Sequence, residues 1–167
     1  LVLRNDQTAS LSNIPAVLTG DLWDGAPIEG EGSGYYRPLM VISLMVDHQL
    51  WPGSAMGHHL HSILWHLLAV YVVFYLLRQS LGVQWAWPVA AVFGLHAAQS
   101  EAVIWISARN DTMAVALGMG ALCFALRPSP SWKSQVLAAL LTVLAGMAKE
   151  SVLLLPLCMW LLCKMMG

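Results

Sequence analysis

Apolar and polar positions along the chain separate into one polar arm and a series of apolar runs. Residues 1–34 carry acidic and glycine residues throughout, a composition typical of a loop outside a membrane. The apolar run at 39–50 is too short to cross a bilayer and contains Asp47, so we expect an interfacial helix there. The later runs predict about five membrane spans, at about 58–77, 83–98, 112–126, 135–148 and 151–163. A span needs roughly 20 residues, so the last three must recruit flanking residues, thin the bilayer or end inside protein.

The composition also favours a membrane protein. Of the 167 residues, 58% are hydrophobic and 10% are charged, against roughly 45–50% and about 25% in soluble domains. So few charges cannot cover the surface of a free soluble domain, and so many apolar residues exclude a disordered tail. Eight basic and nine acidic residues leave no basic patch for nucleic acid. The predicted fold class is all-α transmembrane, with an external loop and interfacial helix (residues 1–51) before a helical bundle (residues 52–167).

The distribution of charges predicts the orientation of the chain. If the arm lies on one side of the membrane, alternating spans place all nine carboxylates on that side. The other side then carries only cations, which are Arg78, Arg127, Lys133 and Lys164. The positive-inside rule makes this basic side cytoplasmic and the acidic loops periplasmic or luminal, in a bacterial inner membrane or an ER membrane. The acidic side also holds four cations, each within a few residues of a carboxylate, which indicates a site: Arg4, Arg37, Arg109 and Lys149.

Two segments concentrate ionisable residues close to membrane depth, where such groups are costly and usually functional. The first joins the second and third spans and carries His96, Glu101, Arg109 and Asp111. It predicts either a functional site or an ion pair of Arg109 with Glu101 or Asp111 that closes a loop. The second segment is Lys149-Glu150, between two short apolar runs. Either Lys149 holds an anionic lipid headgroup and Glu150 orients it, or the two form a simple snorkelling pair.

Histidines at the start of the first span and one aspartate in the arm are further candidates. The histidines are His58, His59, His61 and His66. No carboxylate or cysteine falls at ligand spacing on that helix, so we expect histidines that face the bundle interior and no metal. His58 and His59, near the acidic side, could contact a polar substrate group. Asp6, at the membrane edge, is either a general base or an ordinary solvated aspartate.

Several segments, taken in order, resemble one family. The chain is similar to the first external loop and second span of GT-C glycosyltransferases at Asn5-Asp6, Asn13-Ile14-Pro15, Gly34-Tyr35-Tyr36-Arg37-Pro38-Leu39, Gly57-His58-His59-Leu60 and His66. The later pieces FGLHAAQSEAVIWISARND and AGMAKESVLLLP resemble segments of the protein O-mannosyltransferase-like branch, which often carries tetratricopeptide repeats. The resemblance runs from about residue 3 to residue 162. The chain departs from the pattern at Ala97 and Gln99, where the branch usually has Pro and His.

The resemblance implies a GT-C-like bundle, of which this chain is the N-terminal portion, and a mechanism. Such enzymes take a sugar, usually mannose, from a polyprenyl- or dolichyl-phosphate carrier and pass it to a protein or other hydroxyl outside the cytoplasm. Asp6 would deprotonate the acceptor, and Arg109 or Lys149 would hold the lipid phosphate. Glu101 would help to shape the donor or acceptor pocket. The implied partners are membrane lipids and the lipid-linked sugar, with no other cofactor.

Two alternatives stay open at this point. A non-catalytic membrane subunit could reuse a degenerate GT-C-like scaffold to pack in a larger membrane complex. The altered HAAQSE segment, the short chain and eight tryptophans favour this alternative. A haem- or quinone-binding redox subunit would instead use His66 and His96.

Overall fold

The computed structural model of the chain describes residues 6–21, 34–158 and 161. Within these ranges every regular element is helical, which confirms the all-α class. The α-helices are α1 (Ile14–Val17), α2 (Pro38–Leu50), α3 (Ala55–Leu81), α4 (Val83–Leu95), α5 (Gln99–Ile104), α6 (Arg109–Ala125) and α7 (Trp132–Ala148). Short 3-10 helices are η2 (Asp6–Ala9), η3 (Leu11–Asn13), η4 (Ile106–Ala108) and η5 (Glu150–Leu154).

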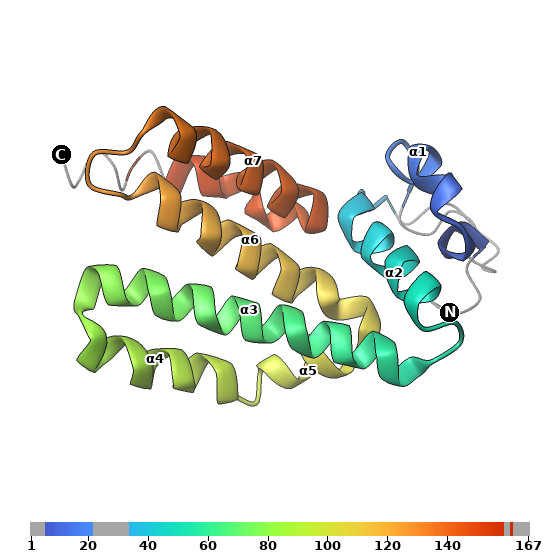
Figure 1. The fold of residues 1–167 in the computed structure, drawn as a ribbon, viewed down its shortest axis with the longest axis horizontal. Coiled ribbons are helices and arrows are strands. Elements are labelled where there is room, and N and C mark those ends of the chain that lie inside the picture. Colours follow the sequence, from blue (N-terminus) through green and yellow to red (C-terminus); the bar gives the residue numbers. More distant parts are fainter. Residues whose placement is uncertain (1–5, 22–33, 159–160, 162–167) are drawn as a thin grey trace.

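In the described part of the chain, the body of the molecule consists of the four helices α3, α4, α6 and α7, called the long helices below (Figure 1). α3 lies between α4 and α6, and α6 lies between α3 and α7. α3 and α6 run in one direction along the long axis, and α4 and α7 return in the other. α2 lies at the end where α3 and α6 begin and α7 finishes, with α1 on its outer side. This topology brings residues from α2, α3, α6 and the segment after α7 to one end of the bundle.

Local sequence signals set where the long helices begin and end. The Ser54 hydroxyl accepts a hydrogen bond from the Gly57 N–H at 3.3 Å and caps α3. Ser131 caps α7 in the same way, through the Ser134 N–H at 3.3 Å. Gly82, with φ of 80°, ends α3 and lets the chain turn directly into α4. A non-glycine residue at this φ would be strained, so the tight connection between α3 and α4 depends on this glycine.

Small residues line the contacts between the long helices. α7 buries three alanines, and α6 buries small residues along its length. A Cβ added to Gly94 of α4 would lie 2.9 Å from a methyl carbon of Val70 on α3, so these helices approach closely. Small residues let helix backbones come together, which is how helices associate where apolar burial alone gives little preference. The buried small residues are Ala69, Ala86, Ala90, Ala114, Ala116, Gly118, Ala121, Ala138, Ala145 and Ala148.

One described helix, α3, is long and apolar enough to cross a membrane. The predicted spans at 83–98, 112–126 and 135–148 coincide with α4, α6 and α7, which have 13, 17 and 17 residues. A crossing needs roughly 20 residues, so five crossings are not confirmed. The polar segment between α4 and α6 shortens both helices. The span predicted at 151–163 begins in η5 and includes residues outside the described ranges.

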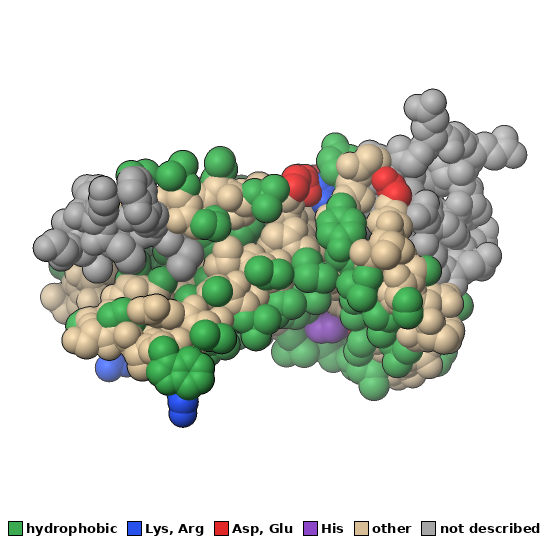
Figure 2. Space-filling model, turned by 90° about the horizontal axis from the view of Figure 1, so that it is seen from above, with side chains coloured by type: hydrophobic (Ala, Val, Ile, Leu, Met, Phe, Trp, Pro, Cys, Tyr) green, Lys and Arg blue, Asp and Glu red, His purple; other side chains and the backbone are tan. Residues whose placement is uncertain are grey.

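Many large hydrophobic side chains are exposed on α3, α4 and α7. Figure 2 shows hydrophobic side chains spread over one face, with acidic side chains toward the α2 end, a basic side chain beside one of them, and further basic side chains at the opposite end. On α3 the exposed residues recur every three or four positions and make a stripe, which comprises Leu60, Ile63, Leu64, Leu67, Leu68 and Tyr71. α7 has a similar stripe, Trp132, Val136, Leu140 and Val143. Soluble monomers rarely expose apolar patches this extended, and such stripes are typical of helices that face lipid or another protein.

Candidate functional site

Three cations on the predicted acidic side each pair with a carboxylate from a different element. The pairs are Arg37–Glu150, Arg109–Asp47 and Lys149–Asp111, all at the α2 end of the bundle. The alternatives to a functional site that we drew from the sequence paired Arg109 with Glu101 or Asp111, and Lys149 with its neighbour Glu150. The structure pairs the two cations differently, because the fold joins elements that are far apart in sequence. The gathering of these cations and carboxylates at one end agrees with the charge sorting.

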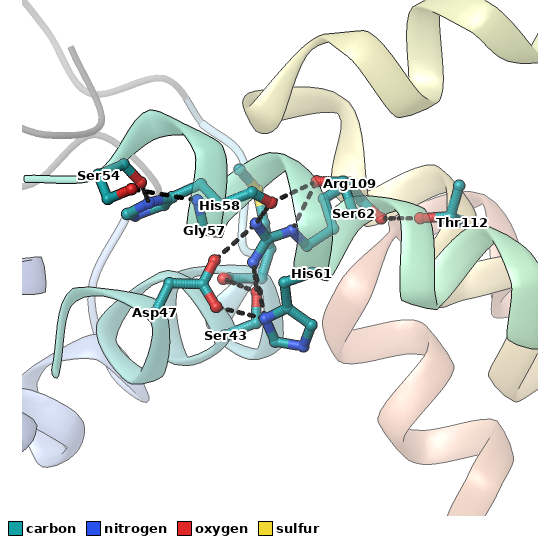
Figure 3. Close-up of polar contacts among 10 residues, drawn as sticks. Ser43, Asp47, Ser54, Gly57, His58, His61, Ser62, Arg109 and Thr112 are labelled. Carbon is teal, nitrogen blue, oxygen red and sulfur yellow. Dashed lines mark hydrogen bonds and ion pairs between the residues drawn. The ribbon is translucent and has the colours of Figure 1, made fainter. Parts of the chain in front are cut away.

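Arg109 is the centre of a buried polar cluster, which also contains Ser43, Asp47, His58, His61 and Ser62 (Figure 3). Its side chain has no exposed surface. Nε donates to Ser62 Oγ at 3.1 Å, Nη1 to Ser43 Oγ at 3.2 Å, and Nη2 to the His58 carbonyl at 2.7 Å. The guanidinium therefore joins α2, α3 and α6, and its donors are directed at groups inside the molecule.

Asp47 supplies the negative charge of this cluster. Its carboxylate has no exposed surface, and its Oδ2 lies 2.6 Å from Arg109 Nη2. No described group makes a well-aligned hydrogen bond to Oδ2, so charge rather than hydrogen-bond direction holds that atom. The other oxygen, Oδ1, contacts His61 Nδ1. A buried charge is tolerated only when it is paired, and Arg109 meets that need for Asp47.

Lys149 and Asp111 form a pair that is open to solvent. Lys149 follows the last residue of α7, and its Nζ contacts Asp111 Oδ1 in the first turn of α6. The side chains are 31% and 41% exposed. Of the two cations expected to hold a lipid phosphate, Lys149 is accessible and Arg109 is enclosed. Exposed ion pairs contribute only about 0–1 kcal/mol, so Lys149 can change partner at little cost.

Arg37 and Glu150 form a two-pronged link between the start of α2 and the segment after α7. Arg37 Nε donates to Oε2 at 3.0 Å, and Nη2 donates to Oε1 at 2.7 Å. These hydrogen bonds lower the pKa of the Glu150 carboxyl below its ordinary value. The Arg37 guanidinium also lies 4.6 Å from the centre of the Tyr35 ring, a cation–π contact. The link fixes the last residues of the arm against the C-terminal end of α7.

An apolar groove of about 540 Å³ lies beside this link. Its walls come from the arm, α7 and the segment that follows α7. The lining residues are Gly34, Tyr35, Tyr36, Thr142, Val143, Gly146, Met147, Glu150, Val152, Leu153 and Pro156. Val143 belongs both to the groove and to the exposed apolar stripe of α7. The groove thus connects an apolar helix face with the charged end of the bundle.

The other residues singled out from the sequence lie in different surroundings. Glu101 is exposed in the first turn of α5. His58 is buried, with its Nδ1 2.9 Å from the Ser54 carbonyl, and His59 is half-buried. Asp6 begins η2, and its side chain lies outside the part of the chain that the structure describes. Of the three whose side chains the structure describes, His58 belongs to the Arg109 cluster, through its carbonyl.

The two histidines of the redox alternative serve helix packing and a turn. His66 Nε2 lies 3.0 Å from the Gly94 carbonyl and links α3 to α4. His96 Nδ1 accepts the Ala98 N–H at 3.1 Å in the turn after α4. Among the described residues, no three His, Cys, Asp or Glu side chains gather as a metal site would require. These contacts give the redox alternative no support.

The sequence did not identify Asp47 or His61 as part of a site. One signal was available, because Asp47 lies inside the apolar run at 39–50 and a carboxylate there needs a buried partner. The local spacing of residues did not show which cation would pair with Asp47. His61 was grouped with its neighbours at the start of the first span, and nothing in the local pattern separates it from them.

Comparison with known proteins supports a relation to O-mannosyl-transferases. The chain is 29% identical over 157 residues to the protein O-mannosyl-transferase Tmtc1 of Drosophila melanogaster. The aligned region covers 90% of this chain and 18% of that protein. It is 35% identical over 99 residues to the protein O-mannosyl-transferase Tmtc2 of the same organism, which covers 58% of this chain and 10% of that protein. No family model and no solved structure matches the chain.

Proposed function

We propose that the chain is part of a GT-C type membrane glycosyltransferase that moves mannose from a polyprenyl or dolichyl phosphate to an acceptor hydroxyl on the periplasmic or luminal side. The observation that carries the proposal is the similarity, along 157 residues, to a protein O-mannosyl-transferase. The chain spans less than a fifth of the length of that relative. The complete reaction therefore belongs to the whole protein, to which this chain contributes one end of a site.

The charged end of the bundle and the apolar groove support a lipid-phosphate substrate. A lipid phosphate needs a cation at the membrane edge for its head and an apolar surface for its chain. Lys149 is an accessible cation, and the groove beside Glu150 continues into the apolar stripe of α7. In this proposal the phosphate takes the place of Asp111 as the partner of Lys149. The hydrocarbon chain lies in the groove and along α7.

The remaining site residues have separate roles in the proposal. Asp6 accepts the proton of the acceptor hydroxyl. The oxygen of that hydroxyl attacks the anomeric carbon of the sugar, and the lipid phosphate leaves with the electron pair of the bond that breaks. Glu101, exposed on α5, borders the donor or acceptor pocket. His59, half-buried beside the enclosed His58, contacts a polar group of the substrate. Arg109 does not touch the phosphate but holds α2, α3 and α6 in place.

A transfer assay with polyprenyl-phosphate mannose tests this proposal on the intact protein in membranes. Lys149→Met removes the accessible cation and Asp6→Asn removes the base, so each should reduce turnover by at least about a hundredfold. Arg78→Met is the matched control, because Arg78 lies in the last turn of α3 at the opposite end of the bundle. Turnover that is unchanged in Lys149→Met and Asp6→Asn would refute the glycosyltransferase proposal.

The exposed apolar stripes on α3 and α7 favour a second candidate, a non-catalytic membrane subunit of a larger complex. Both stripes suit lipid, but they also suit packing against other membrane proteins. Purification of the intact protein in stoichiometric amounts with a large membrane complex, without any sugar transfer, would favour this candidate. Purification as an active transferase on its own would exclude it.

A further inference from the structure

His61 differs from the other described histidines of α3 in what surrounds its ring. Its Nδ1 contacts Asp47 Oδ1, and the ring stacks on Trp65 with 6.2 Å between ring centres. His58 and His66 instead direct a ring nitrogen at a backbone carbonyl. The His66 ring also lies against Phe93, with 6.3 Å between ring centres, so it is the carboxylate contact that sets His61 apart. A carboxylate on one ring nitrogen and an aromatic ring on one face hold the imidazole in a single orientation. Such an orientation is needed where the second nitrogen has to meet a ligand.

The contact with Asp47 also decides which nitrogen of His61 carries the proton. Two groups contact Nδ1: the Asp47 carboxylate, which accepts hydrogen bonds, and Arg109 Nη1, which can only donate and lies farther away, at 3.4 Å. The closer contact, with Asp47, assigns a hydrogen to Nδ1, which Nδ1 donates to Oδ1. The charged groups that face the ring from other helices are Asp47 of α2 and Arg109 of α6. In the imidazole tautomer with its hydrogen on Nδ1, Nε2 is unprotonated and accepts hydrogen bonds.

His61 is the member of this cluster that reaches the surface. Its side chain is 24% exposed, whereas Asp47 and Arg109 have no exposed surface. In Figure 3 the side of the ring that carries Nε2 points away from Asp47 and Arg109. None of the described residues makes a hydrogen bond to Nε2. The fold therefore presents one oriented acceptor atom, on a ring held by Asp47 and Trp65.

The ring lies at the same end of the bundle as the accessible cation. Trp65, on which the ring stacks, packs against the buried cluster of Met113, Ala114 and Ala148, and Lys149 follows Ala148 directly. Asp111, the partner of Lys149, precedes Met113 by less than one helical turn. A ligand that has both an anionic group and hydroxyl groups could meet Lys149 with the first and His61 with the second.

We propose that His61 is a ligand-binding residue whose Nε2 accepts a hydrogen bond from a substrate hydroxyl, with Asp47 and Arg109 as positioning residues for its ring. This inference rests on the proposed function, which supplies two sources of such a hydroxyl. One source is the sugar of the lipid-linked donor, and the other is the acceptor. In both cases the hydroxyl donates to Nε2, and no bond to the imidazole is formed or broken.

Substitution of His61 by Asn tests the proposal in the transfer assay with the intact protein. The Asn amide can replace Nδ1–H as the donor to Asp47 but has no group at the place of Nε2. His48→Asn is the matched control, because His48 is a half-buried histidine of α2 outside the cluster. Because His61→Asn loses one hydrogen bond to the ligand, the KM of the substrate that carries the hydroxyl should rise about tenfold, with little change in kcat. His61→Gln, whose side-chain oxygen reaches toward the place of Nε2, should recover part of the loss.

The outcomes separate the sources and the two hypotheses. A raised KM for polyprenyl-phosphate mannose assigns the hydroxyl to the sugar, and a raised KM for the acceptor assigns it to the acceptor. Two KM values equal to those of His48→Asn would overturn the role of His61 while leaving the glycosyltransferase proposal intact. A wild-type protein without transfer activity would refute the glycosyltransferase proposal, and this inference with it. A measurement that needs no activity is the ¹⁵N spectrum of labelled histidine, where a protonated Nε2 on neutral His61 would also overturn the inference.

Discussion

The buried pair of Asp47 and Arg109 predicts a large loss of stability when one charge is removed. Asp47→Asn keeps the size of the side chain and an oxygen for His61 Nδ1–H, but it leaves Arg109 buried without a counter-charge. Neither side chain has any exposed surface, and the two groups lie 2.6 Å apart. Removing one partner of a buried pair costs about 3–5 kcal/mol. We therefore expect the free energy of unfolding of Asp47→Asn to fall by about 3–5 kcal/mol.

The matched control is Asp111→Asn, which removes the carboxylate of the exposed pair. Because its side chains are 31% and 41% exposed, we expect a loss of about 0.2–1 kcal/mol. Unfolding by denaturant in detergent micelles, followed by circular dichroism, measures both variants. A double variant, Asp47→Leu with Arg109→Met, buries no charge and should recover most of the loss. If Asp47→Asn were no less stable than Asp111→Asn, the pair would not be what holds α2 on the bundle.

Two further predictions concern the ends of α7 and α3. The lowered pKa of Glu150 means that the Arg37 link stabilises the fold above the ordinary pKa of a glutamate and is lost as the pH falls through the lowered pKa. Thermal unfolding of Glu150→Gln should lack that part of the acid dependence, and equal acid dependence in both proteins would contradict the assignment. Gly57→Ala should cost about 1–3 kcal/mol, because the added Cβ would lie 2.4 Å from Trp51 Cγ. Gly120→Ala is the control, because the nearest atom to an added Cβ there lies 3.6 Å away, and it should be neutral or stabilising. Equal unfolding midpoints for Gly57→Ala and Gly120→Ala would refute this interpretation of the Trp51 contact.

Helix positions were readable from the sequence because apolar runs are local signals. The run at 39–50 corresponds to α2 at 38–50, and the run at 58–77 lies within α3 at 55–81. The lengths of the predicted spans agreed less well with the structure than their positions did. The ionisable segment between α4 and α6 forms short helices and turns, so it does not lengthen either neighbour into a clear span.

The partners of the charges were not readable, because they are decided by which helix ends meet. The sequence predicted that Arg37, Arg109 and Lys149 share a side with the carboxylates, and the three pairs agree with this. The family resemblance implied that Arg109 or Lys149 holds the lipid phosphate. Only the packing of α2 over α3 and α6 shows that Asp47 is the ion-pair partner of Arg109. Spacing within one segment carries no information about such a distant partner.

The position of Asp47 also has a consequence for how the chain is made. During synthesis Asp47 leaves the ribosome before α3, α4 and α5, and its counter-charge arrives only with the first residue of α6. Until then α2 carries a carboxylate that cannot be buried without cost, so it stays at the water interface. Burial of Asp47 in its pair with Arg109 therefore has to wait until α3, α4 and α5 have been made and α6 has begun.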